Sequence, residues 1–156
     1  MAEGREFSRQ AATAMQAGQW QQAEELLRQG LDASPDDPEL QRQLAEVLWQ
    51  RGAANEAMSH AADAVRLKPG DATLVVRAGE MALTSGATDV ALTHAEDAIR
   101  LQPRLASAWT LRGRTFRKLN QPDRAVADFQ RALVFEPENA DVLLELATLY
   151  RERGDH

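Results

Sequence analysis

Apolar residues recur along this chain at steps of three and four, which is the spacing of amphipathic helices. In residues 38–50, for example, the apolar stripe consists of Leu40, Leu44, Val47 and Leu48. A second stripe with helical spacing follows in residues 54–67. The pattern therefore predicts two helices joined by a short turn.

The residues at the ends of these two stripes favour helix starts and stops. Asp37 can accept hydrogen bonds from the first free backbone N–H groups, and Pro38 takes the first helical position, where no donor is needed. Gly52 suits the left-handed residue that ends the first helix, and Pro69 stops the second. These residues set the bounds of one helix pair.

The same stripes and ends recur through the whole chain and predict an all-helical protein. The predicted helices span about 4–17, 20–33, 38–50, 54–67, 72–84, 88–101, 106–118, 122–135 and 140–153. We find no strand pattern, which would alternate apolar and polar residues.

The helix pairs follow one template that repeats every 34 residues. Prolines mark the period at Pro35, Pro69, Pro103 and Pro137. Small residues occur in register at Ala11, Ala45, Gly79, Gly113 and Ala147, and again at Ala23, Ala57, Ala91 and Ala125. The turn position is occupied by Gly18, Gly52, Gly86, Asn120 and Gly154. A side chain no larger than a methyl group lets two helices approach closely, so the small-residue columns predict helix crossings.

A 34-residue helix–turn–helix repeat with small residues at these points resembles the tetratricopeptide repeat family, over roughly residues 4–156. The resemblance implies a right-handed α-solenoid superhelix of antiparallel helix pairs with a concave groove. The repeats would span about 4–37, 38–71, 72–105 and 106–139, followed by the single helix 140–153. Because no linker-like or low-complexity tract interrupts the period, we expect residues 1–156 to form a single domain.

The composition limits the class of protein further. Charged residues make up 27% of the chain and hydrophobic residues 44%, which is typical of a globular helical protein. The apolar runs are short and the start MAEGREFSRQ lacks the hydrophobic core of a signal peptide, so we expect no membrane insertion. The absence of cysteine excludes disulfides and thiol catalysis. A cytoplasmic location is the default expectation, and a periplasmic one stays open.

Basic residues are concentrated in one repeat of an otherwise acidic chain. The net charge is −6, yet residues 106–139 carry 6 basic and 4 acidic side chains. Arg114, Arg117 and Lys118 stand at i, i+3 and i+4, which places them on one face of a helix. These charges indicate either a site for an acidic ligand or an ordinary solvated face.

In the family, the first helix of each pair lines the groove, and the resemblance therefore implies a set of groove residues. They are Arg42, Glu46, Trp49, Val76, Arg77, Glu80, Leu83, Arg114, Arg117 and Lys118. This mixed surface with a positive end predicts a protein or peptide partner, with an acidic segment as one option. The pI of about 5.1 and the small number of clustered cations argue against nucleic acid.

The three tryptophans differ in their predicted roles. Trp109 falls in a column of bulky residues and is predicted to pack in the core, while Trp20 is predicted to pack against the first helix–helix turn. For Trp49, a groove anchor and an inter-repeat contact stay equally open.

The sequence predicts no catalytic residue, metal site or cofactor, and hence no enzyme. His60 and His94 share one column with Asp128, but side chains on neighbouring second helices are too widely spaced for a ligand set. Ser59 and His60 point in different directions on a helix, and no third residue orients them. Each glycine lies at a helix end or crossing, so none forms a phosphate-binding loop.

These observations predict a protein-interaction scaffold that holds a peptide segment or partner helix in its groove. Two alternatives remain: a targeting or substrate-presenting fragment of a larger enzyme or secretion assembly, and a self-assembly module. Helix 140–153 bears on both, because it carries Leu143, Leu144, Leu146, Leu149 and Tyr150. Covering it on one side only would leave apolar residues exposed, so either the natural protein continues or residues 140–153 mediate weak self-association.

Overall fold

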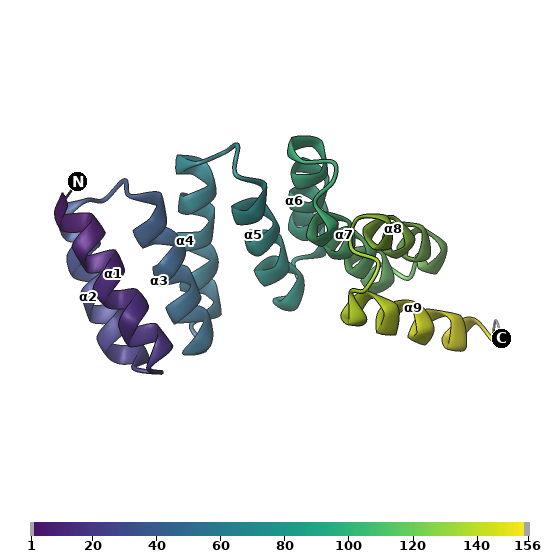
Figure 1. The fold of residues 1–156 in the computed structure, drawn as a ribbon, viewed down its shortest axis with the longest axis horizontal. Helices are drawn as coiled ribbons and strands as arrows, with labels where there is room; N and C mark the ends of the chain where they lie inside the picture. Colours follow the sequence, from purple (N-terminus) through teal and green to yellow (C-terminus); the bar gives the residue numbers. More distant parts are fainter. Residues whose placement is uncertain (1, 155–156) are drawn as a thin grey trace. The chain divides into compact units, whose positions relative to one another are not determined.

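The computed structural model describes residues 2–154, and every regular element in this range is a helix (Figure 1). The helices are α1 (Ala2–Gln16), α2 (Trp20–Ala33), α3 (Pro38–Gln50), α4 (Ala54–Leu67), α5 (Ala72–Thr84), α6 (Thr88–Leu101), α7 (Ala106–Lys118), α8 (Pro122–Phe135) and α9 (Ala140–Arg153). The predicted all-α fold of antiparallel pairs is confirmed. The predicted bounds hold for all helices but α1, which begins two residues earlier than 4–17 and ends one residue earlier.

The helix ends follow the residues that predicted them. Asp37 Oδ1 accepts hydrogen bonds from the backbone N–H of Glu39 at 2.9 Å and of Leu40 at 3.2 Å. The Asn139 side chain caps α9 in the same way, by accepting from Val142 N at 3.2 Å. The residues at the turn position of each repeat are those with positive φ in the described chain, namely Gly18, Gly52, Gly86, Asn120 and Gly154. Asn120 is the one non-glycine among the described residues with this conformation, at a φ of 58°.

The chain divides into two compact units, one ending at Leu74 and one beginning at Val75, so that the boundary falls within α5. In the first unit, α1 to α4 pack around a core that includes Leu27, Leu40 and Leu44, all fully buried. In the second unit, Phe129 of α8 is buried between α7 and α9 together with Val142 and Leu149. The expectation of a single domain over residues 1–156 stays a prediction.

Glycines mark close helix crossings in both units. A methyl group added at Gly30 would lie 2.9 Å from Cβ of Phe7. One added at Gly113 would lie 2.7 Å from the ring of Phe129. Both distances are shorter than a normal carbon contact, so glycine lets these helices approach where a larger side chain would separate them.

The tryptophans lie at packing positions. Trp109 is half-buried against the core of the second unit, and its Nε1 donates to the carbonyl oxygen of Pro103 at 2.9 Å. Trp20 and Trp49 pack against the core of the first unit. The core role predicted for Trp109 is confirmed. Trp20, predicted to pack against the first helix–helix turn, opens α2 directly after that turn and packs against the core, and of the two options for Trp49 the packing role gains support. Among the described helices, none is long and apolar enough to cross a membrane.

Candidate functional site

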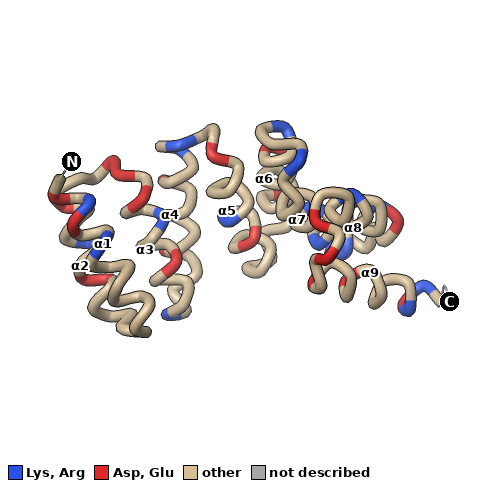
Figure 2. The backbone as a smooth tube through the Cα atoms, in the orientation of Figure 1, with Lys and Arg blue, Asp and Glu red and all other residues tan. Residues whose placement is uncertain are grey.

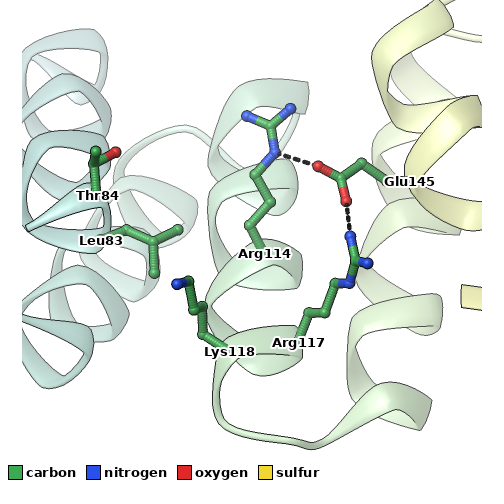
Figure 3. Close-up of a pocket in the computed structure, with 6 residues that line it drawn as sticks. All are labelled: Leu83, Thr84, Arg114, Arg117, Lys118 and Glu145. Atoms are coloured by element: carbon green, nitrogen blue, oxygen red, sulfur yellow. Dashed lines mark hydrogen bonds and ion pairs between the residues drawn. The ribbon is translucent and has the colours of Figure 1, made fainter. Parts of the chain in front are cut away.

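A pocket of about 600 Å³ lies on the second unit, on one face of α7 (Figure 3). Its lining residues are Leu83 and Thr84 of α5, Arg114, Arg117 and Lys118 of α7, and Glu145 of α9. The structure thus brings together four residues of the predicted groove, namely Leu83, Arg114, Arg117 and Lys118. It places them between the C-terminal end of α5 and the first half of α9.

The local sequence of α7 positions the three cations. The buried Phe116 lies on the side of α7 away from Arg114 and Lys118, and Arg114, Arg117 and Lys118 face the pocket. Arg117 and Lys118 also stand in the last turn of α7, where basic side chains interact favourably with the helix dipole. Packing of the buried face therefore fixes the direction of the charged one.

Glu145 of α9 joins two of these cations. It accepts a hydrogen bond from Arg114 Nε at 2.9 Å and another from Arg117 Nη1 at 2.8 Å (Figure 3). Arg117 additionally donates from Nη2 to Glu152 at 2.8 Å. The side chains of Arg114 and Arg117 are 37% and 35% exposed, so these ion pairs are partly screened by solvent. They orient the guanidinium groups more than they stabilise the fold.

Lys118 and the outer edge of Arg114 stay available for a ligand. Arg114 uses only Nε toward Glu145, and its two terminal nitrogens make no hydrogen bond among residues 2–154. Lys118 is exposed and forms no ion pair in the described part of the chain. Its side chain extends toward α5, where Leu83 lines the same pocket (Figure 3). The pocket thus combines free hydrogen-bond donors with one apolar side chain, Leu83, which is 9% exposed.

Glu145 lines the pocket but is not among the residues predicted from the sequence. It follows Arg114 by 31 residues and Arg117 by 28. In a chain with a 34-residue period, these separations place the side chains on successive first helices, offset by about one turn for Arg114 and by nearly two turns for Arg117. The period itself could therefore have indicated an acidic partner on α9.

The other predicted residues of the second unit lie outside the pocket lining. Arg77 and Glu80 form an ion pair within α5 at 3.3 Å. Val76 is only 4% exposed and packs in the protein. The prediction of Val76 as a groove contact is therefore wrong, because its side chain is buried.

Three predicted residues belong to the first unit. Arg42 pairs with Glu39 at 2.6 Å, and this hydrogen bond raises the pKa of the Arg42 guanidinium. Glu46 and Trp49 are half-buried on the same helix, α3. These residues are not among those that line the pocket on α7.

The histidine column has a structural environment rather than that of a ligand set. His60 Nδ1 lies 2.6 Å from Oε1 of Gln41, and burial lowers the pKa of His60. Burial also lowers the pKa of His94. Asp128, the next residue of the column, is bound by Arg112 at 2.8 and 2.9 Å. In the range 2–154, no group of three or more histidine, aspartate or glutamate side chains could hold a metal ion.

Comparisons with known proteins bear on the fold. Sequence profiles of the tetratricopeptide repeat match residues 14–78, 76–135 and 110–156. Among curated proteins, no sequence matches the chain.

Several solved structures are similar over nearly the whole chain. MamA from Desulfovibrio magneticus RS-1 (residues 41 to its end) has a TM-score of 0.88 and 20% identity, covering 100% of this chain and 88% of that one. PilF of Pseudomonas aeruginosa has a TM-score of 0.88 and 18% identity, with 99% and 70% covered. A thermophilic TPR protein of Thermus thermophilus has a TM-score of 0.78 and 24% identity, with 97% and 84% covered. At such identities the likeness concerns the fold alone.

Proposed function

Because the chain belongs to the tetratricopeptide repeat family, whose repeats generally bind other proteins, we propose that it is a non-catalytic interaction scaffold. Its ligand in this proposal is a segment of a partner protein in which an acidic side chain stands beside an apolar one. The binding site is the pocket on α7 formed by Leu83, Arg114 and Lys118. The single observation that carries the proposal is the pair of unused cationic groups beside the apolar side chain of Leu83.

A carboxylate suits these two groups. Arg114 and Lys118 are four residues apart on α7, so their side chains lie on one face about one helical turn from each other. Both can donate charge-assisted hydrogen bonds, which are stronger than neutral ones. An aspartate or glutamate of the ligand would bind both donors, and neither donor would first have to break an internal ion pair.

Glu145 contributes to this site as a positioning residue. By accepting from Arg114 Nε it fixes the guanidinium plane and leaves the outer edge toward solvent. The cost of ordering a long arginine side chain is then met before the ligand arrives. Glu145 also lowers the positive charge of the pocket, so it tunes the affinity for an acidic segment as well as the geometry.

The size of the pocket limits what it recognises. About 600 Å³ is within the usual range for ligand pockets and accommodates a few side chains rather than a folded domain. Leu83 can contact an apolar side chain of the ligand while the cations bind its neighbour. Charges at the rim mainly raise the association rate, and the apolar contact prolongs the bound state. We therefore expect moderate affinity with a marked dependence on salt.

The proposal can be tested with two defined probes. One is a fluorescent peptide that alternates leucine and aspartate, and the other has asparagine in place of each aspartate. Fluorescence anisotropy should detect binding of the acidic peptide only, weakening as salt rises. The double variant Arg114→Gln/Lys118→Gln should bind about tenfold more weakly or worse.

The matched control is Arg100→Gln, which removes a cation from α6 that is 71% exposed and paired with Asp97. It should leave the affinity unchanged, because Arg100 does not line the pocket. Equal binding of the acidic and the asparagine peptides would contradict the proposal. So would an acidic peptide whose affinity the Arg114/Lys118 double variant leaves intact.

A further inference from the structure

One face of α9 is uncovered although its counterparts in the chain are buried. Ala106, Thr110 and Gly113 of α7 are buried, and α8 packs against this helix. The residues 34 positions later are Ala140, Leu144 and Ala147, and all three are exposed. Leu144 is 68% exposed, the highest value among the large exposed hydrophobic residues of the described chain. Each of these three residues of α9 occupies the repeat position of an α7 residue that is buried.

The exposed side of α9 carries a seam for helix pairing. Asp141, Leu144, Thr148 and Arg151 follow each other at steps of three, four and three, which keeps them on one side of the helix. The Thr148 hydroxyl donates to the backbone oxygen of Leu144 at 2.8 Å, so its methyl group can face a partner. The small side chain of Ala147 beside the seam permits close approach.

The seam is complementary to itself in the antiparallel direction. Residues 141 and 151 are centred on position 146, and so are residues 144 and 148. A two-fold axis at this position would set Asp141 opposite Arg151 and Leu144 opposite Thr148. Figure 2 shows the corresponding polarity of α9, with an acidic first turn and a basic last turn. Within residues 2–154, Asp141 and Arg151 take part in no ion pair, so both charges are available.

We infer that α9 is a self-association surface, in which it pairs antiparallel with α9 of a second copy of this chain. Two hydrogen-bonded charge pairs then flank a centre made by Leu144, Ala147 and Thr148. Glu145 and Glu152, which reach α7, lie off the seam, so the pairing leaves the pocket on α7 open. The inference does not rest on the proposed ligand.

The size of the contact sets the expected strength. Two helices of 14 residues bury less surface than the roughly 1,200–2,000 Å² of a stable interface. A weak and concentration-dependent dimer follows, with a dissociation constant on the order of 100 μM. The symmetry is closed, so association should stop at two copies rather than extend into filaments.

Sedimentation equilibrium tests the inference directly. Between about 10 μM and about 1 mM protein, the average mass should rise from 17.2 kDa toward twice that value. Leu144→Glu should abolish the rise. Val134→Glu is the matched control, since Val134 is similarly large and 62% exposed but lies on α8. It should dimerise like the unchanged protein, and circular dichroism should give the same helix content for all variants.

Charge reversal tests the register. The two-fold axis places residue 141 of each copy opposite residue 151 of the other. Asp141→Arg alone or Arg151→Asp alone would therefore create two pairs of like charges, and each variant should weaken the dimer by about tenfold. The double variant Asp141→Arg/Arg151→Asp restores opposite charges and should dimerise as the unchanged protein does. Failure of the double variant to recover would overturn the antiparallel register. A monomer at every concentration would overturn the inference and assign the exposed face of α9 to another protein or to solvent.

Discussion

Glu145 accepts a hydrogen bond from Arg114 at 2.9 Å, so one carboxylate already neutralises part of the candidate pocket. The same carboxylate accepts from Arg117, whose other terminal nitrogen is bound by Glu152. Arg114 and Lys118 therefore have nitrogens that a ligand can bind. We expect Arg117 to contribute less to ligand binding than either of them, because both of its terminal nitrogens are already bound.

Replacing Glu145 by glutamine should tighten binding of the acidic peptide by about threefold at low salt, because the pocket gains positive charge. The free energy of unfolding should fall by less than about 1 kcal/mol, since both ion pairs are partly exposed. Anisotropy and chemical denaturation measure the two effects. Glu138→Gln, an equal charge change at an exposed residue outside the pocket, is the control. Weaker binding by Glu145→Gln would show that the orientation of Arg114 matters more than the charge.

Arg112→Leu should destabilise the protein by roughly 3 kcal/mol in chemical denaturation, because a buried charge without its partner is costly. Arg112 donates two hydrogen bonds to Asp128, whose carboxylate is buried. The Arg112→Leu/Asp128→Leu double variant should recover most of the loss. Arg100→Leu, which breaks an exposed pair with Asp97, should cost less than about 1 kcal/mol. Equal losses from Arg112→Leu and Arg100→Leu would contradict the argument.

Gly113→Ala should lower the stability by about 1 kcal/mol, because alanine gains about 1 kcal/mol over glycine from helix propensity but overpacking typically costs about 1–3 kcal/mol. Here the added methyl group would meet three ring atoms of fully buried Phe129 at 2.7, 2.9 and 3.2 Å. Gly70→Ala makes the same change where an added Cβ meets no described atom within 4 Å. Thermal melts should show a loss for Gly113→Ala and none for Gly70→Ala.

The two half-buried histidines should make the fold less stable in mild acid. Burial lowers the pKa of His60 and His94, so the folded protein binds their protons less tightly than the unfolded chain does. Glu56 and Asp63 raise the pKa of His60, Arg28 lowers it further, and Asp97 raises that of His94, but burial dominates in both. Their contribution is present above the unfolded pKa of about 6.5 and is lost as pH falls toward the folded values.

Thermal melts between about pH 8 and about pH 5 measure this loss, which the double variant His60→Gln/His94→Gln should reduce. The glutamines keep a polar side chain at each position but do not titrate. An identical decline of the melting temperature in both proteins would assign the acid sensitivity to other groups.

The helices and turns could be predicted because their causes are local. Asp37, Pro38 and Gly52 act within a few residues of the backbone groups that they cap or turn. Because the pattern repeats every 34 residues, the bounds of one helix pair predict those of the next. The start of α1 was misplaced because no strong capping residue precedes it.

The site was harder to predict, because charge partners depend on how helices pack. The face shared by Arg114, Arg117 and Lys118 followed from helical spacing alone. The bridge from Glu145 did not, since it joins side chains on two helices, and neither did the contact between His60 and Gln41. Whether the remaining predicted groove residues contact a ligand stays a prediction.

Arg112 and Asp128 also restrict how the repeats could be recombined. In the second and third repeats the position of Asp128 is held by His60 and His94. A chimaera that replaced α8 by α4 or α6 would set an imidazole beside the guanidinium of Arg112 and remove its carboxylate. A graft that carries α7 and α8 together keeps both partners. At this point of the chain, exchange of a whole helix pair keeps the two charges matched, whereas exchange of a single helix would create a charge mismatch.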